Sequence, residues 1–266
     1  MAEILVGTSG YDYPEWRGVL YPHDLPREEF LAFYAEQFSA LELNFSYYSM
    51  PDEAQMTSMV RRSNGKLRFS VKAHRSLTHE ISVSAWREAA REFRAAMLPL
   101  ASRDLLLSVL LQFPQAFHYD VDERRYLDGL VGELGNLPIV VEFRHASWQN
   151  PRVYEAFRKR GLGWCITDMP SLRNLPARRA IVTAKSAYLR FHGRNAESWH
   201  GTNARSRYEY LYSDEELAEY LPLIGEIAGG ADLVQIYFNN HAKGHAVVNA
   251  QKMRILSGRG SVPSRD

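Results

Sequence analysis

The stretch that decides the fold is Ile139-Val-Val-Glu-Phe-Arg-His-Ala-Ser-Trp148. Its residues alternate in character, as the two faces of a β-strand require. Val141 and Phe143 point to one side of the predicted strand. Glu142 and Arg144 point to the other side, and a polar turn follows before the next predicted helix. A carboxylate and a guanidinium on one face of a strand, followed by a polar turn, are typical of strands that hold functional side chains.

The same unit, a strand followed by a helix, repeats along the chain. The predicted strands are 3–7, 40–44, 67–72, 105–112, 139–144, 163–168, 187–192 and 232–238. The predicted helices are 26–38, 51–62, 84–100, 122–134, 151–160, 213–229 and 244–256, and Ser213-Asp-Glu-Glu216 is a capping box. This alternation predicts an α/β fold, a (β/α)8 TIM-barrel-like domain over residues 1–256, with an open doubly wound sheet as the alternative. We expect residues 257–266 to form a flexible tail.

The composition limits the classes of protein to consider. The 266 residues carry a formal net charge of +1, which argues against a globally basic nucleic-acid-binding protein. Cys165 is the single cysteine, so an intrachain disulfide and a cysteine-rich metal site are excluded. We find no signal peptide and no apolar run near the ~18 residues that a membrane span needs. A cytoplasmic protein without membrane contact is therefore expected.

Several predicted strands alternate apolar and polar residues, although parallel strands buried on both faces are usually apolar throughout. In a barrel, we expect the polar face to line the interior. The active sites of such barrels lie at the C-terminal ends of the strands. We predict catalytic roles there for Glu42, Glu142, His192 and Lys72, and ligand-binding roles for Ser9, Asn44, Gln112, Arg144, His145, Asp168, Arg190, Tyr237 and Asn239.

One alternative is that these polar groups only neutralise each other as ion pairs. Neighbouring strands would pair Glu42 with Lys72. They would likewise pair Arg144 with Asp168.

Six motifs stand in order along the chain. They are Gly7-Thr-Ser-Gly10 with Tyr11 and Trp16, Leu41-Glu-Leu-Asn44 with Tyr47-Tyr48, Gln112-Phe-Pro114, Val141-Glu-Phe-Arg-His-Ala-Ser-Trp148, Leu189-Arg-Phe-His-Gly193, and Tyr237-Phe-Asn-Asn240 with residues 246–250. Together they resemble the YecE-like family, domain of unknown function 72, over residues 6–253. The resemblance implies a TIM-barrel-like fold and brings no established activity. The family often has tryptophan where Tyr11 stands, so an aromatic residue is retained.

Cations outnumber anions at the predicted mouth of the barrel, which favours a small anionic ligand such as a phosphate or carboxylate. In barrels, phosphate often lies after strands seven and eight. Those loops are His192-Gly-Arg194 and residues 239–244, the second of which leads into a helix N-terminus. The alternative is that Asn239 and Asn240 only shape a turn and cap that helix.

A divalent metal is a weaker hypothesis. Its candidate ligands are Glu142, His145, Asp168 and His192, and such carboxylate and imidazole sets suit Zn, Mn or Mg. Arg144 and Arg190 would oppose a cation there, and no metal-binding histidine motif is present. No other cofactor is identified.

Two further chemistries are open. Glu42 and Glu142, across the barrel from each other, could work as a carboxylate pair, as in glycosidases. Lys72, beside Arg75, could have a lowered pKa and act as a Schiff-base amine, although an ion pair with Glu42 is the preferred interpretation. The aromatic residues of the two long loops could stack sugar rings or bases, or form an apolar lid or dimer contact; they are Tyr11, Tyr13, Trp16, Tyr21, Trp199, Tyr208, Tyr210 and Tyr212.

We therefore predict an enzyme that acts on a small anionic, phosphorylated or sugar-like substrate by acid–base chemistry. One alternative is a nucleic-acid-binding protein or phosphodiesterase, for which Arg17 and Arg194 would be phosphate contacts. Another is a non-catalytic ligand-binding scaffold. Neither a reaction type nor an oligomeric state is predicted.

Overall fold

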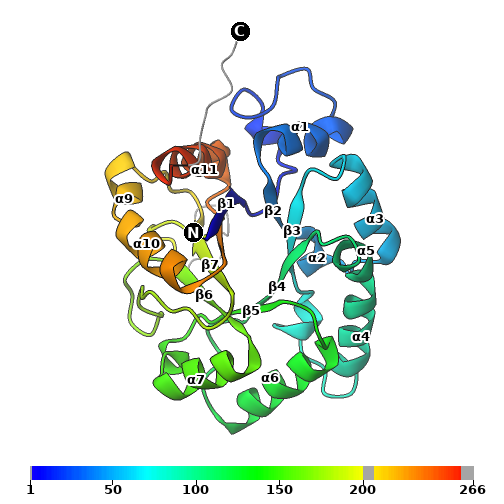
Figure 1. Ribbon diagram of the computed structural model, residues 1–266, viewed down its shortest axis with the longest axis vertical. Helices are drawn as coiled ribbons and strands as arrows, with labels where there is room; N and C mark the ends of the chain where they lie inside the picture. The colour runs from blue at the N-terminus through cyan, green and yellow to red at the C-terminus, as the bar shows by residue number, and fades with distance from the viewer. Residues whose placement is uncertain (1, 200–206, 259–266) are drawn as a thin grey trace.

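The strands form one ring of parallel neighbours in the order β1-β8-β7-β6-β5-β4-β3-β2. The computed structural model describes residues 2–199 and 207–258, and the strands in those residues form a nearly closed barrel (Figure 1). Their bounds are β1 (Glu3–Thr8), β2 (Ala40–Leu43), β3 (Arg68–Lys72), β4 (Leu106–Gln112), β5 (Ile139–Glu142), β6 (Gly163–Asp168), β7 (Ser186–Phe191) and β8 (Leu233–Phe238). The (β/α)8 prediction is confirmed, and the open doubly wound sheet is wrong.

The ring closes between β1 and β2. Ser9 and Glu42 form a single parallel bridge there, and the amide of Gly10 donates to the Glu42 carbonyl oxygen at 2.8 Å. Gly7 permits this approach, because a Cβ at that position would lie 2.2 Å from the carbonyl oxygen of Ala40. The first glycine of the Gly7-Thr-Ser-Gly10 motif therefore has a steric role in closing the barrel.

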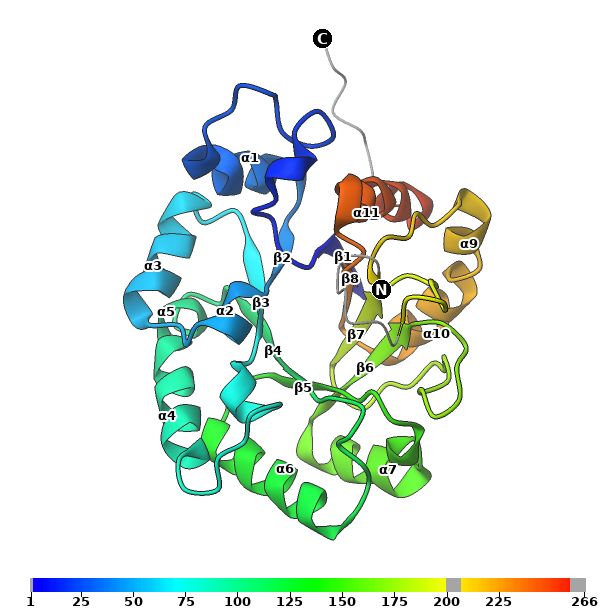
Figure 2. The ribbon, with the colours of Figure 1, turned by 180° about the vertical axis from the view of Figure 1, so that it is seen from behind.

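The helices surround the strands, as the two opposite views show (Figures 1 and 2). They are α1 (Phe30–Gln37), α2 (Phe45–Tyr48), α3 (Glu53–Arg62), α4 (Trp86–Ala96), α5 (Leu98–Ala101), α6 (Val121–Leu134), α7 (Pro151–Arg160), α9 (Asp214–Ala218), α10 (Leu221–Gly230) and α11 (His245–Leu256). Residues 169–185, all of them described, join β6 to β7 without a helix. Among the described helices, none is both long enough and apolar enough to cross a membrane.

Proline divides two helices that we predicted as continuous. The helix expected over 84–100 is α4 followed by α5, with Pro99 in the first turn of α5. The helix expected over 213–229 is α9 followed by α10, with proline again in the first turn of the second helix. Proline lacks an amide proton and clashes with the preceding turn, so it starts helices better than it continues them. The capping box at Ser213 is confirmed, since its Oγ accepts from the Glu216 amide at 3.2 Å.

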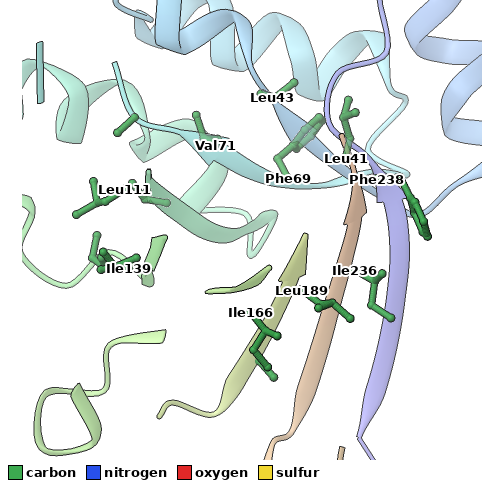
Figure 3. Close-up of a cluster of buried hydrophobic side chains, with 14 of the residues drawn as sticks. Leu41, Leu43, Phe69, Val71, Leu111, Ile139, Ile166, Leu189, Ile236 and Phe238 are labelled. Atoms are coloured by element: carbon green, nitrogen blue, oxygen red, sulfur yellow. The ribbon is translucent and has the colours of Figure 1, made fainter. Parts of the chain in front are cut away.

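The apolar side chains of the strands form two separate layers. One layer points outward against the helices, and Figure 3 shows part of it; its labelled members are Leu41, Leu43, Phe69, Val71, Leu111, Ile139, Ile166, Leu189, Ile236 and Phe238. The other layer is a separate cluster at the barrel interior and consists of Leu5, Ala40, Leu107, Leu110, Val140, Cys165, Tyr188 and Tyr237. The polar residues that alternate with the outer layer therefore face the interior, as predicted. Of the predicted tail, only Ser257 and Gly258 belong to the described residues.

Candidate functional site

A buried ion-pair network spans the barrel interior above the inner apolar layer. Arg190, on β7, donates through Nη2 to Oε1 of Glu42 on β2 at 2.8 Å. Through Nη1, it donates to Oε2 of Glu142 on β5 at 2.5 Å. All three side chains are fully buried. Arg190 therefore links three strands that are far apart in the sequence and are not neighbours in the ring.

The ion pairs differ from those expected between neighbouring strands. Glu42 is bound by Arg190 and by the hydroxyl of Tyr188, which donates to its Oε2 at 2.7 Å, and it does not pair with Lys72. The interior of the barrel is narrow, so side chains that point to its axis meet partners from the opposite wall. Sequence reasoning missed Tyr188, although its alternation with Arg190 along β7 already placed it on the inner face.

A second layer lies closer to the C-terminal ends of the strands. Arg144 donates through Nε to Glu142, rather than to Asp168 as expected. Nε2 of His192 lies 3.2 Å from Oε1 of Glu142, and Nδ1 lies 3.0 Å from the side-chain amide nitrogen of Asn239. The neutral imidazole that satisfies both contacts donates from Nε2 to Glu142 and accepts at Nδ1 from Asn239.

Electrostatics fix the charges of this layer. Burial, followed by the charge of the Arg144 guanidinium, lowers the pKa of His192 to about 3, so the ring is neutral at physiological pH. Burial alone would raise the pKa of Glu142. The charges of Arg144 and Arg190, together with the hydrogen bond from His192, outweigh burial and hold that pKa well below its usual range. Glu142 is thus a permanently ionised carboxylate that orients its neighbours, and it is poorly suited to take up a proton.

The buried imidazole predicts an acid-sensitive fold. Since the folded pKa of His192 is about 3 and its ordinary value is 6.5, only the unfolded chain binds this proton between those pH values. Stability contributed by the neutral ring is therefore fully present above pH 6.5 and is lost as pH falls, at about 1.4 kcal/mol per pH unit. The free energy of unfolding of His192→Gln can be measured in urea between pH 6.5 and 4.5. It should change with pH less steeply than that of the parent protein, by the equivalent of about one bound proton. Equal slopes would contradict a buried neutral ring, and His118→Gln, at an exposed position, is the control.

Lys72 differs from the other cations of the site. It is half-buried at the end of β3, and its Nζ lies 4.0 Å from the ring centroid of Tyr47. No carboxylate of the described residues lies within ion-pair distance of it. Burial, followed by the charge of Arg190, lowers the pKa of Lys72 to about 7, although Glu142 and Glu42 oppose the shift. Lys72 therefore titrates near neutral pH.

Aromatic residues of the long loops approach this layer. The guanidinium of Arg144 lies 5.6 Å from the ring centroid of Trp199, and the ring of Tyr208 lies 6.1 Å from that of His192. Tyr13 stacks on His241 at 4.8 Å. The other aromatic residues of these loops have different positions. The outer core contains Tyr11, Trp16, Tyr21 and Tyr212, and Tyr210 donates to Glu216.

Four other predicted site residues lie on strands or directly after them. Ser9 Oγ and Asn44 Oδ1 are buried at the C-terminal ends of β1 and β2, and neither has a hydrogen-bond partner among the described residues. Gln112 donates to the carbonyl oxygen of Phe113 at 2.7 Å. Tyr237 lies in the inner apolar layer, with its hydroxyl 3.0 Å from Ser70 Oγ, so it belongs to the floor of the barrel.

Asp168 does not face the barrel interior. It shares its outward face with Trp164 and Ile166, which belong to the outer core. Its carboxylate accepts from the hydroxyls of Tyr212 and Tyr220, the first at 2.5 Å, and from Nε of Arg194 at 3.1 Å. The prediction that Asp168 belongs with the ligand-binding residues of the interior is therefore not supported by its position; the alternation with Trp164 and Ile166 was the signal we did not use.

The four candidate metal ligands do not converge. His145 stacks on His118 at 3.9 Å and its Nδ1 contacts Ser147 Oγ at 2.8 Å, while Asp168 faces the outer core. Only Glu142 and His192 remain close to each other. Among the residues that the structure describes, no group of three His, Cys, Asp or Glu side chains could hold a metal ion.

The loops after β7 and β8 are held by internal contacts. Arg194, predicted as a phosphate contact, binds Asp168, Glu216 and Glu219. The side-chain amide of Asn240 donates to the carbonyl oxygen of Tyr210 at 2.8 Å. Arg17 donates to the carbonyl oxygens of His23 and Leu25, both at 2.7 Å. Arg17 and Arg194 are therefore engaged by groups of the protein itself, whereas Arg144 and Lys72 lie at the barrel interior.

Comparisons with known proteins agree with this architecture. A family model described as "Protein of unknown function DUF72" matches residues 5–264. The UPF0759 protein YunF of Bacillus subtilis (strain 168) is 28% identical over 270 residues, which cover 95% of this chain and 94% of that protein. A DUF72 family protein of Thermotoga maritima MSB8 is 34% identical with a TM-score of 0.87, covering 96% of this chain and 98% of its own. A DUF72 family protein of Enterococcus faecalis V583, 23% identical with a TM-score of 0.85 and covering 98% and 99% of the two chains, shares the fold.

Proposed function

The chain belongs to the DUF72 family, as its six motifs predicted, and we propose that it is an enzyme that acts on a small anionic substrate by acid–base chemistry at the mouth of the barrel. The substrate class is a phosphorylated or carboxylated metabolite. The proposal is supported by the placement of charged side chains at the C-terminal ends of the strands, where barrel enzymes hold their substrates.

The main support for the proposal is an excess of cations in the barrel interior. The network contains the carboxylates of Glu42 and Glu142 and the cationic groups of Arg144, Arg190 and Lys72. Two negative charges thus face three groups that carry positive charge when protonated. An uncompensated buried charge costs several kcal/mol, on the order of the total stability of a domain. A bound anion would neutralise the excess, so the site is more favourable with an anion than without one.

Arg144 is the group best placed to bind that anion. Its Nε donates to Glu142, which fixes one edge of the guanidinium, and its Nη2 lies 3.1 Å from Nε2 of His192. Among the described residues its Nη1 has no hydrogen-bond partner, and the residue is 9% exposed. A guanidinium that is oriented on one edge and open on another is suited to hydrogen-bond a phosphate or carboxylate.

Lys72 is the group best placed to transfer a proton. A catalytic acid or base works best when its pKa lies near the operating pH, and the pKa of Lys72 is lowered to about 7. His192, with a pKa near 3, and Glu142, with a pKa well below its usual range, are weak bases at neutral pH. We therefore assign acid–base work to Lys72 and orienting roles to Glu42, Glu142 and His192.

Inorganic phosphate is expected to stabilise the protein against thermal unfolding, relative to sodium chloride of equal ionic strength. A ligand at ten times its Kd raises the unfolding free energy by about 1.4 kcal/mol. Arg144→Met should abolish this stabilisation, because it removes the proposed anion contact. Arg125→Met should retain it, since Arg125 is 78% exposed on α6 and pairs with Asp122 on the same helix.

Equal phosphate stabilisation of the protein and of Arg144→Met would contradict the anion site. Turnover is tested separately by incubation with a mixture of phosphorylated and carboxylated metabolites, in which the consumed compound is identified by NMR. Anion binding without any turnover would support a non-catalytic scaffold instead. Tight binding of a single-stranded oligonucleotide with a steep salt dependence would support the nucleic-acid alternative.

A further inference from the structure

We propose that Lys72 forms an imine with the carbonyl carbon of the substrate, so that the substrate is a small aldehyde or ketone that also carries a carboxylate or phosphate. This inference rests on the proposed function, because it takes the anion site at Arg144 as the group that positions the substrate. It adds a covalent step and a narrower class of substrate.

The environment of Lys72 is unlike that of the other lysines. Four of the six lysines form an ion pair with a carboxylate: Lys66 with Glu36, Lys159 with Glu155, Lys243 with Glu209 and Lys252 with Asp214. Lys185 is exposed and precedes β7, at the end of the barrel opposite the mouth. Lys72 alone combines a position at the C-terminal end of a strand with the lack of an ion-paired carboxylate among the described residues.

The backbone and the side chain of Lys72 are both held in place. Its carbonyl oxygen accepts from Ser46 Oγ at 2.6 Å, which ties the end of β3 to α2. Its Nζ lies over the ring of Tyr47, the next residue of the same helix. The amine is thus oriented by packing and not by a charged partner. A covalent bond to a ligand would break no ion pair of the described residues.

Neighbouring charges favour the neutral amine that the reaction needs. Burial and the guanidinium groups of Arg190 and Arg144 disfavour a further positive charge, and the pKa of Lys72 is lowered to about 7. About half of the molecules then carry a neutral Lys72 amine at pH 7, whereas a lysine with an ordinary pKa is neutral in less than about one molecule in a thousand.

The step is balanced with the groups at hand. The lone pair of the Lys72 amine forms a bond to the carbonyl carbon, and the carbonyl oxygen takes up the proton that the nitrogen releases. The resulting carbinolamine takes up one proton from the solvent at the open mouth of the barrel and loses water, which leaves an iminium ion. This cation lies near the carboxylates of Glu42 and Glu142, whose charges favour a cation at Lys72. No oxidant, reductant or metal is required.

Borohydride trapping tests the proposal. The protein is incubated with pyruvate or glycolaldehyde phosphate, which are anionic carbonyl compounds, and with acetone as the neutral comparison. Sodium borohydride then reduces any imine to a stable secondary amine, which peptide mass mapping assigns to a residue. We expect an adduct at Lys72 with at least one anionic probe, at an occupancy at least ~10-fold above that at Lys185. The rate of adduct formation should rise with pH around a midpoint near 7.

Control variants separate this inference from the proposed function. Lys72→Arg should abolish the adduct and keep the stabilisation by phosphate, whereas Lys185→Arg should change neither. Adducts spread equally over Lys72 and Lys185, or no adduct at Lys72, would overturn the imine. If phosphate still stabilises the protein in that case, the anion site stands without the covalent step. If phosphate has no effect, the proposed function fails as well.

Discussion

Replacing Arg190 by methionine is expected to lower the free energy of unfolding by about 4 kcal/mol, because it leaves two buried carboxylates without their shared partner. Glu42 and Glu142 have no exposed surface, so water cannot replace the lost guanidinium. Tyr188 still donates to Glu42 and Arg144 still donates to Glu142, but neither residue contacts both carboxylates as Arg190 does. Urea unfolding at neutral pH measures the loss.

Two comparisons test the physical reason for this loss. Burial raises the pKa of an unpaired carboxyl, so the folded variant should bind protons that the folded parent does not. Its deficit in stability should therefore be smaller at pH 5 than at pH 8. The double variant in which Glu42→Gln accompanies Arg190→Met should be more stable than the single variant, because it removes the carboxylate that has no other charged partner, while Glu142 keeps its ion pair with Arg144. A pH-independent deficit, or a double variant that is no more stable than the single variant, would mean that lost packing dominates.

Asp168→Ala is expected to lower the free energy of unfolding by about 3 kcal/mol, since two buried hydroxyls and a guanidinium lose their acceptor. Tyr212 and Tyr220 both donate to this carboxylate, and Arg194 pairs with it. Tyr212 in turn holds the loop, because its hydroxyl accepts from the amide of Gly193 at 2.8 Å. Hydrogen exchange of the amides of residues 207–213 should accelerate, because Asp168 anchors this connection to β6.

The control for Asp168 is a carboxylate that makes one exposed ion pair. Asp128 is 72% exposed and pairs with Arg160, so Asp128→Ala should cost less than about 1 kcal/mol. Asp168→Asn keeps the size of the side chain and loses only its charge, so its effect should be intermediate. If Asp168→Ala instead left stability unchanged and abolished stabilisation by phosphate, the role in ligand binding inferred from the sequence would be restored.

These two sites show that strongly bound carboxylates serve different purposes in this barrel. The network around Arg190 occupies the axis, where it orients Arg144 and leaves Lys72 without a carboxylate partner. The cluster around Asp168 lies on the outer face and fastens a loop. Since only the first contains cations that are open to a ligand, substitutions there should separate loss of binding from loss of stability, whereas substitutions at Asp168 should not.

The sequence by itself determined the fold and the faces of the strands. A period of two along β2, β5 and β7 places Glu42, Glu142 and Arg190 on one side of each strand, and the repeat of strand and helix predicts a parallel barrel. These are local properties, because the direction of a side chain along a strand depends only on its position in that strand. The same rule would have assigned Asp168 to the outer face, had it been applied to β6.

Only the tertiary structure decided which groups pair. Arg190 and Glu42 are 148 positions apart, and no local rule relates them. Closure of the ring brings opposite walls within reach of one guanidinium, which left Lys72 without the carboxylate that neighbouring strands would have supplied. The chemistry that we propose for Lys72 therefore depends on this closure: in an open sheet with the same strands, Glu42 and Lys72 would be neighbours free to neutralise each other.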